Sequence, residues 1–145
     1  MKLSSRGHYG VRAMGELAKA YGKGPLALAQ ISDVEKLPLA YLEQLFATLR
    51  KAGLVESTRG VHGGYELTRD PASITMGEVV RVLEGPISFV ECATEAADGN
   101  CCELGDSCPS RFVWQKVRDS VAGVLDSMTL ADLVRDQQIP TAVLE

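Results

Sequence analysis

Long apolar runs are absent from this 145-residue sequence, and no segment is long enough to span a bilayer. The first eight residues, MKLSSRGH, contain no apolar core of a secretory signal. We therefore predict a cytoplasmic protein with no membrane partner. A Ser/His/Asp set and a glycine-rich phosphate loop are also missing, so we predict that the protein is not an enzyme.

Zinc knuckles are missing as well, although the chain has four cysteines. No two of them have the Cys-x₂₋₄-Cys spacing that structural zinc sites usually show. Because the cytoplasm keeps thiols reduced, these cysteines are expected to be metal ligands or redox sensors rather than disulfide partners.

The length suits one domain, or a small domain with an appendage, and 46% hydrophobic residues are enough for a core. Charge is unevenly distributed: residues 1–69 hold 10 Lys and Arg against 6 Asp and Glu, a net +4, whereas residues 70–145 hold 5 against 13, a net −8. Attraction to phosphates is local, so the basic half can face a polyanion despite the overall charge of −4. This asymmetry favours DNA binding.

Residues 38–53 predict a helix with two different faces. Pro38 suits its first turn, Gly53 ends it, and apolar residues recur at helical spacing on one face, namely Leu42, Leu45, Phe46 and Leu49. The opposite face carries groups able to hydrogen-bond base edges or phosphates in a major groove: Tyr41, Glu43, Gln44, Thr48 and Lys51.

A β-hairpin is predicted directly after this helix. One strand starts at Leu54 and Val55, the other contains Tyr65 and Leu67, and the glycine-rich tip between them begins with Arg59. A polar-faced helix followed by such a hairpin is the form of a winged helix-turn-helix, whose wing would place Arg59 against phosphates or in a minor groove. The alternative is an ordinary surface helix and hairpin.

Two further helices precede this unit. An apolar stripe at Val11, Met14, Leu17, Ala18 and Tyr21 predicts the first, and a short second helix runs through Leu28 and Ile31. At the start of the first helix, Ser4, Ser5, Arg6 and Tyr9 could donate to a phosphate, or a serine there could cap the helix.

The second half of the chain predicts a capped helix, an irregular segment and a long helix. Residues 75–78 fit a capping box, and residues 87–107 are too polar for a core element. A coiled-coil-like stripe follows at Val113, Trp114, Val117, Val121, Val124, Leu125 and Met128. It would pack on its own domain or, as we favour, pair with a second copy, which would supply two readers for a palindromic site. A short helix from Thr129 to Gln137 ends the fold.

The predicted fold is mainly α with a small β-hairpin. Residues 1–85 form a winged helix-turn-helix domain, residues 86–108 a cysteine-bearing loop, and residues 109–145 a dimerisation helix and tail.

All four cysteines lie in this loop, at Cys92, Cys101, Cys102 and Cys108. Thiolates bind soft metals, and an acidic, glycine-containing loop can wrap an iron–sulfur cluster, with zinc as the competing metal. Adjacent Cys101 and Cys102 are poorly placed to bind one ion together, which makes one of them a candidate bystander. The alternative is four unrelated small hydrophobic residues.

Five segments, in this order and at these spacings, carry a family resemblance: MKLSSRGHYG, YLEQL, LRKAGLVESTRGVHGGYELTR, GEVVRVLEGP and WQKVRDSVAGVLDSMTL. They resemble the IscR-like bacterial transcription regulators, whose relatives include NsrR, RirA and CymR. The similarity runs from Met1 to about Leu133, and the RGxxGGY wing with the cysteine loop is its most specific part.

The resemblance implies a homodimeric winged-helix regulator whose long C-terminal helix forms the dimer and whose cluster controls DNA binding. It assigns sequence reading to Glu43, Gln44 and Arg59. The complete set of predicted DNA-contacting residues is Ser4, Arg6, Tyr9, Leu39, Tyr41, Glu43, Gln44, Arg50, Arg59, Gly60, His62, Gly63, Gly64 and Tyr65.

The family's ligand pattern maps onto Cys92, Cys102 and Cys108, with Cys101 as a substitute for Cys102. IscR has a histidine ligand three residues after its last cysteine, where this chain has Arg111. Relatives use an acidic residue at the start of the first helix, where this chain has His8, a candidate fourth ligand or a surface or phosphate-contacting residue. A [2Fe–2S] cluster is favoured, with [4Fe–4S] as the alternative.

We therefore predict a DNA-binding regulator, acting as a repressor, that senses iron–sulfur, iron or redox status. Its expected partners are an operator duplex, a second copy of itself, and proteins of iron–sulfur assembly or cysteine metabolism. One alternative keeps the fold but senses through thiols, zinc or a partner enzyme, as in CymR-like members. Another is a thiol or cluster carrier, for which a basic front half and an Arg-bearing wing have no use.

Overall fold

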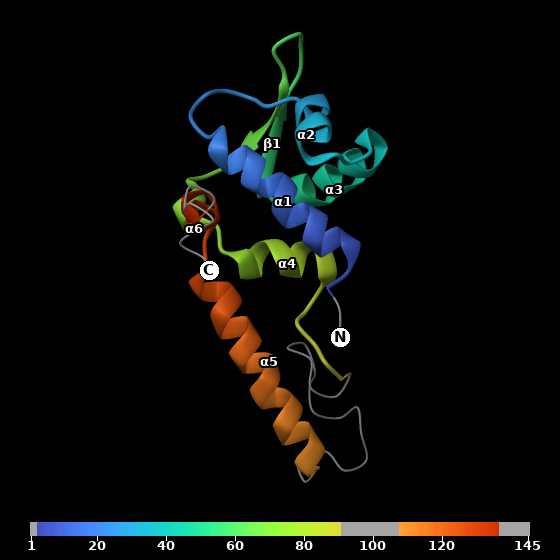
Figure 1. Cartoon of the computed structure of the whole chain (residues 1–145), viewed down its shortest axis with the longest axis vertical. Coiled ribbons are helices and arrows are strands. Elements are labelled where there is room, and N and C mark those ends of the chain that lie inside the picture. Colours follow the sequence, from blue (N-terminus) through green and yellow to red (C-terminus); the bar gives the residue numbers. More distant parts are fainter. Residues whose placement is uncertain (1–2, 91–107, 137–145) are drawn as a thin grey trace, which may run out of the picture.

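The computed structural model describes residues 3–90 and 108–136 of the chain. Figure 1 shows a body built from helices around a two-stranded hairpin, with one long helix extending from it as a rod and the hairpin tip projecting at the opposite end. In chain order the elements are α1 (Ser5–Lys19), α2 (Leu28–Glu35), α3 (Leu39–Lys51), β1 (Val55–Thr58), β2 (Gly64–Leu67), the 3₁₀ turn η1 (Pro71–Ser73), α4 (Met76–Glu84), α5 (Pro109–Ser127) and α6 (Leu130–Asp136). The mainly helical fold with a small hairpin is confirmed.

The helix predicted after Pro38 is α3, and its apolar stripe faces the core. Leu42, Leu45, Phe46 and Leu49 are each at most 1% exposed. Pro38 lies at the N-cap, one position before the predicted first turn, with an extended backbone. Gly53 ends the helix with a φ of +80°, a left-handed conformation that glycine adopts without steric cost.

The hairpin is antiparallel, and Val55 pairs with Leu67 while Thr58 pairs with Gly64. Strand β1 begins at Val55 rather than at Leu54, because the Leu54 N–H still bonds the Leu49 carbonyl at 3.1 Å as part of the helix exit. A third segment joins the sheet at one point: Leu26 and Tyr65 exchange two backbone hydrogen bonds of 2.8 and 2.9 Å.

Helix α1 contains glycines where alanine would favour a helix by about 1 kcal/mol each, and tertiary packing explains two of them. A Cβ on Gly10 would lie 2.0 Å from Leu83 Cδ1, and a Cβ on Gly7 would lie 2.7 Å from Glu84 Oε1. Gly7 and Gly10 therefore allow α1 and α4 to pack in close contact. The predicted stripe on α1 is correct at Met14, Leu17 and Ala18, which are buried.

The prediction for Tyr21 was wrong. Helix α1 ends at Lys19, and Tyr21 follows it with a side chain that is 43% exposed. The reason is local: the helix ends two residues before Tyr21, and Gly22, with a φ of +85°, and Gly24, with a φ of +95°, then continue the turn, so helical spacing no longer directs Tyr21 to the core.

Only one of the two hydrogen bonds of the predicted capping box forms at the N-terminus of α4. Thr75 Oγ1 accepts from the Glu78 N–H at 3.1 Å, but the Glu78 carboxylate pairs with Arg69. A complete box occurs instead at α6, where Thr129 and Asp132 bond each other's backbone N–H at 3.0 and 3.2 Å. The hydrogen bond from the Thr129 backbone N–H lowers the pKa of Asp132.

Helix α6 returns the chain to the N-terminal body. The Leu130 N–H bonds the Ile74 carbonyl at 3.0 Å, and the Leu130 side chain is fully buried in the core that α1 also lines. The predicted final helix is therefore confirmed with slightly shorter bounds, and it forms part of the packed body.

The long predicted helix is α5, and only part of its apolar surface is covered. Val121 and Leu125 are partly buried on the side that faces Val80 of α4, and Arg81 binds Asp126 through bonds of 2.7 and 3.1 Å. Val113 and Val124, in contrast, are 52% and 59% exposed. Packing against α4 of the same chain thus covers the edge with Val121 and Leu125. Pairing with a second copy stays a prediction for the exposed edge with Val113 and Val124.

Within the parts of the chain that the structure describes, no helix combines the length and the hydropathy needed to cross a membrane.

We expect Leu130→Ala to lower the free energy of unfolding by about 2–5 kcal/mol, because it removes a fully buried side chain where α6 meets the body. Val34→Ala is the matched control, since Val34 is 63% exposed on α2 and its truncation should change stability by less than about 0.5 kcal/mol. Urea denaturation measures both. Equal losses in the two variants would contradict the packing of α6 described above.

Candidate nucleic-acid interface

The outward face of α3 presents four of the predicted DNA-contacting residues to solvent, including the predicted sequence readers Glu43 and Gln44. Glu43, Gln44 and Arg50 are exposed, and Leu39 at the start of the helix is 43% exposed. Their helix is fixed from behind by the buried stripe that ends at Leu49. A rigid helix with exposed amide, carboxylate and guanidinium groups can read base edges in a major groove.

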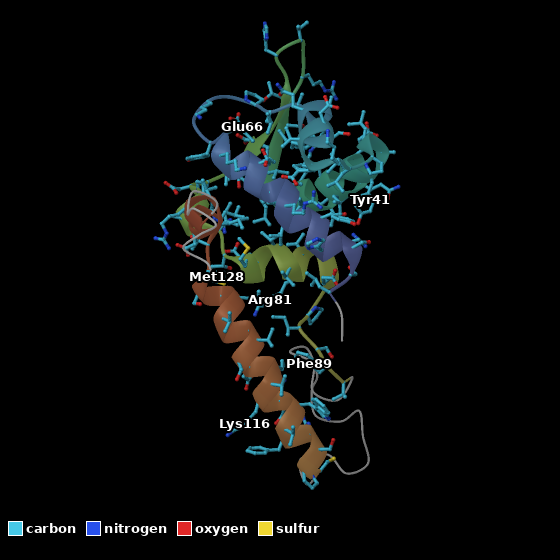
Figure 2. The ribbon with its side chains drawn as sticks, viewed as in Figure 1. Tyr41, Glu66, Arg81, Phe89, Lys116 and Met128 are labelled. Carbon is cyan, nitrogen blue, oxygen red and sulfur yellow. The ribbon has the colours of Figure 1, made fainter. Side chains whose placement is uncertain are left out.

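Tyr41 and Tyr9, both predicted DNA contacts, lie against each other. Figure 2 shows Tyr41 where α3 lies beside the start of α1. The two rings meet edge to face with centroids 6.1 Å apart, and the Tyr41 hydroxyl donates to Ser5 Oγ at 3.3 Å. The pair therefore braces α3 against α1, and direct contact of either ring with DNA stays a prediction.

Arg12, which the sequence pattern did not single out, extends this brace to α2. Its guanidinium lies 5.4 Å from the centre of the Tyr9 ring. Arg12 Nε binds Glu35 Oε2 at 2.8 Å, and Nη2 donates to the Glu35 carbonyl at 2.7 Å. Arg12 thus fixes the C-terminal end of α2 relative to α1. No local signal reveals it, because its partner is 23 residues away.

The start of α1 is joined to the end of α4. Ser4 occupies the N-cap position, but its hydroxyl donates to the Glu84 carboxylate and makes no capping bond to its own helix. Glu84 also accepts from the Gly7 N–H at 2.9 Å. Ser4 was predicted to donate to a phosphate or to cap the helix. In the structure it does not cap α1; the Glu84 carboxylate of α4 accepts from both Ser4 and the Gly7 N–H and so caps α1 instead. Arg6 and His8 are exposed nearby.

The wing has an exposed tip and a fixed base. Arg59, Gly60 and His62 are exposed, and the Gly63 N–H bonds the Gly60 carbonyl at 3.0 Å to close the turn. At the base, the Tyr65 ring lies 5.0 Å from that of Phe46, so Tyr65 packs on the core and anchors the wing.

Gly63 and Gly64 are required by close backbone contacts. A Cβ on Gly63 would lie 2.2 Å from the Thr58 carbonyl oxygen, and one on Gly64 would lie 2.4 Å from that of Leu26. Gly64 also has a φ of +155°. The glycines of the RGxxGGY motif therefore shape the wing, whether or not they also contact DNA.

The positively charged side chains fall into two groups, those that form an ion pair and those that do not. Arg12, Lys19, Arg69, Arg81, Arg118 and Arg135 each form an ion pair with an acidic residue. Seven other cations form no ion pair within residues 3–90 and 108–136. One of them, Lys116 on α5, lies over the Phe112 ring at 5.3 Å, and the other six lie between the start of α1 and the wing: Arg6, Lys23, Lys36, Arg50, Lys51 and Arg59. Unpaired cations on one domain are available to phosphates. Lys23 and Lys36 were not among the predicted contacts.

The predicted metal ligands lie mostly outside the described residues. This applies to Cys92, Cys101 and Cys102, whereas Cys108 is the partly exposed N-cap residue of α5. Arg111, one turn further, is only 8% exposed. Residues 3–90 and 108–136 contain no group of three or more His, Cys, Asp or Glu side chains able to hold a metal.

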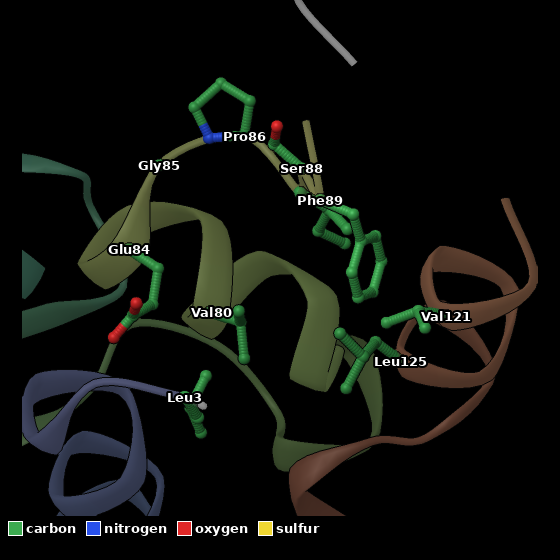
Figure 3. A pocket seen from close by; sticks show the side chains of 10 residues that line it. Leu3, Val80, Glu84, Gly85, Pro86, Ser88, Phe89, Val121 and Leu125 are labelled. Carbon is green, nitrogen blue, oxygen red and sulfur yellow. The ribbon is translucent and has the colours of Figure 1, made fainter. Parts of the chain in front are cut away.

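A hollow of about 610 Å³ lies where the chain leaves α4 toward the cysteine segment. Figure 3 shows Val80, Val121 and Leu125 around it, together with Glu84 and Phe89. The hollow therefore connects the start of the cysteine segment, the rod α5 and the Glu84 contact with α1.

The fold and this arrangement were compared with known proteins. Residues 3–136 match the family described as Rrf2, iron-dependent transcriptional regulator. The chain belongs to the Rrf2 family. Members of this family are transcriptional regulators that bind DNA as dimers. Membership confirms the predicted family and the prediction that the protein is not an enzyme.

Two related regulators show the extent of the similarity. The chain is 48% identical to the HTH-type transcriptional regulator CymR of Bacillus subtilis over 134 residues, which cover 92% of this chain and 89% of CymR. It is 40% identical to the HTH-type transcriptional regulator IscR of Escherichia coli over 139 residues, which cover 96% and 83% of the two chains.

Solved structures of related proteins have the same fold. The structure of CymR, described as the global cysteine regulator of B. subtilis, superimposes with a TM-score of 0.79 at 47% identity and covers 93% of this chain and 97% of CymR. The structure of T. potens IscR gives a TM-score of 0.77 at 43% identity, with 97% and 93% covered.

We expect Gly64→Ala to lower the free energy of unfolding by about 1–3 kcal/mol, because the added methyl group would overlap the Leu26 carbonyl at the base of the wing. Gly123→Ala is the control, since a Cβ there meets no atom within 4 Å and alanine favours the helix. Thermal unfolding of both variants, followed by circular dichroism, tests this. A Gly64→Ala protein as stable as Gly123→Ala would show that the wing base has room for a side chain.

Proposed function

We propose that this Rrf2 protein is a homodimeric repressor that binds an operator through α3 and the wing, and that an iron–sulfur cluster controls this binding. The observation that carries the DNA-binding part is that six of the seven described cations without an ion pair lie between the start of α1 and the wing. Among the described residues only Lys116, on α5, lies elsewhere, whereas four cations beyond the wing, Arg69, Arg81, Arg118 and Arg135, each face an acidic partner. This distribution directs the attraction for phosphates to one side of the chain.

Sequence recognition divides between two elements. Glu43 and Gln44 are the proposed base readers in the major groove, where an amide can bond adenine and a carboxylate can accept from cytosine. Arg59, on the exposed wing, is the proposed minor-groove or phosphate contact. The remaining predicted contacts, including Arg50 and His62, would position the protein on the backbone.

Pairing of two chains along α5 is the proposed mode of dimerisation. Its support is the uncovered apolar edge of α5, where Val113 and Val124 are more than half exposed, beside Phe112 at 59%. Burial of such an edge against a second copy would remove apolar surface from water. A two-fold dimer would also present two α3 helices to a palindromic operator.

Cluster control rests on the donor chemistry of the chain. Cys108 is a partly exposed thiol at the N-cap of α5, and thiolates suit iron–sulfur clusters. Cys92, Cys102 or Cys101, and Cys108 are the proposed ligands, with exposed His8 as a candidate fourth. When bound, the cluster would supply a covalent tie between these segments. A [2Fe–2S] cluster is favoured over [4Fe–4S].

The proposed route of control runs through Glu84. This residue ends α4, lines the hollow that Phe89 also lines, and accepts from Ser4 and Gly7 at the start of α1. A shift of the segment before Cys92 would therefore reach the helix that braces α3. The cluster can move this equilibrium only by binding two arrangements with different affinity.

A second candidate keeps DNA binding but senses cysteine metabolism through thiols, zinc or a partner enzyme. The similarity to CymR, which is described as a global cysteine regulator, supports this second candidate. The similarity to IscR and the description of the family as iron-dependent support the cluster. A cluster carrier is less favoured, because delivery of a cluster does not require six unpaired cations between the start of α1 and the wing.

We expect Arg59→Ala to lose operator binding, and Gln44→Ala to relax sequence preference with nonspecific binding retained, since base contacts discriminate by about 1–3 kcal/mol each. Arg135→Ala is the control, because Arg135 lies on α6 and pairs with Asp132. Footprinting and competition with random duplex measure the effects. Unchanged footprints in the Arg59 and Gln44 variants would contradict this reading of the interface.

Protein purified without air is expected to show broad visible absorption with bound iron and sulfide, and its operator affinity should differ from that of the apo form. Equal affinity of holo and apo protein across sites would end the proposal of cluster control. Colourless protein with zinc or without metal would favour the second candidate. Both forms should be compared at one salt concentration, because phosphate contacts depend steeply on it.

A further inference from the structure

A notch of about 450 Å³ lies between the tip of the wing and the connection from α1 to α2. One wall consists of residues 23–25 with Ala27 and Gln30 at the start of α2, and the other consists of residues 61–63 of the wing. The notch is therefore bordered by the wing on one side and by the helix-turn-helix unit on the other.

The two walls are held in a fixed relation. Leu26 and Tyr65 exchange backbone hydrogen bonds of 2.8 and 2.9 Å directly below the notch. Gly64 allows this pairing, because any Cβ would lie 2.4 Å from the Leu26 carbonyl oxygen. Lys23 is held in turn by a bond of 2.9 Å from its N–H to the Ala20 carbonyl. The notch is thus a feature of the packed fold rather than of two independent loops.

The polar side chains that line the notch can each donate a hydrogen bond. Lys23 and His62 line it, and no acidic side chain does. Lys23 forms no ion pair within residues 3–90 and 108–136, whereas Lys19, four residues earlier, binds Glu16 at 3.1 Å. Gln30 Oε1 accepts from the Ala27 N–H at 3.2 Å, which leaves the amide nitrogen of Gln30 to donate. An ammonium, an imidazole and an amide around one hollow suit an anionic oxygen ligand.

The position of the notch indicates which anion it meets. In a winged helix on a duplex, the reading helix enters the major groove and the wing reaches an adjacent groove or its phosphates. The sugar–phosphate backbone that separates these two grooves must then pass between the helix-turn-helix unit and the wing. We infer that the notch binds a backbone phosphate of the operator, with Lys23 as its charged contact and His62 and Gln30 as further donors. This inference rests on the proposed function, and it adds Lys23 and Gln30 to the interface.

The test uses a duplex that the wild-type dimer selects from a random-sequence pool. Affinity is measured against salt concentration for the wild type, Lys23→Ala, Lys23→Arg and Lys19→Ala. We expect Lys23→Ala to bind about threefold to tenfold more weakly at low salt and to lower the slope of log affinity against log salt by about one. Lys23→Arg should retain the slope. Lys19→Ala should match the wild type, because its ammonium lies outside the notch and is paired.

A second measurement locates the phosphate. Duplexes in which one phosphate at a time is replaced by an uncharged methylphosphonate should reveal a position that weakens the wild type and leaves Lys23→Ala unaffected. A Lys23→Ala protein with the affinity and slope of Lys19→Ala, or with wild-type sensitivity at every methylphosphonate, overturns the notch assignment alone. A wild type that selects no duplex contradicts the proposed function itself, so the two failures are distinguishable.

Discussion

Two backbone hydrogen bonds between Leu26 and Tyr65 are the constraint on which the reading surface depends. They join the segment before α2 to the wing, while the Tyr65 ring rests on Phe46 of α3. These contacts join the wing to the helix-turn-helix unit. Because α3 and the wing would enter different grooves, their separation has to match DNA, and a wing attached only through its own strands could not hold that separation. Gly64 is the residue that makes the close backbone pairing possible.

A second constraint links this rigid reader to the segment that bears the cysteines. Gly7 and Gly10 allow α1 to pack closely on α4, and Glu84 at the end of α4 accepts hydrogen bonds from Ser4 and the Gly7 N–H. Helix α1 in turn holds α2 and α3 through Arg12 and the paired tyrosine rings. Contiguous contacts therefore extend from the last turn of α4 to the reading helix. Such contacts can transmit a shift only if the interface has two discrete arrangements.

The surfaces left unsatisfied by the single chain indicate what it meets. The reader has cations without acidic partners, and α5 has an apolar edge around Val113 and Val124 without a covering element among the described residues. The wing and the rod α5 project at opposite ends of the molecule (Figure 1), so the surfaces proposed for DNA and for a second copy are separate. This arrangement fits the proposed regulator, which would bind DNA with one surface and a second copy with the other.

The sequence by itself determined the elements whose signals are local. The apolar stripe around Leu42 and Phe46 marks α3, and glycines mark the turns, because burial of one helix face and a positive φ both leave their trace within a few residues. Local pattern did not reveal the partner of Arg12, the external cap that Glu84 provides, or the place of Lys23 beside the wing. The periodicity of apolar residues indicates which face of a helix is buried, but not which element covers it. Contacts between residues far apart in the chain are therefore seen only in the tertiary structure.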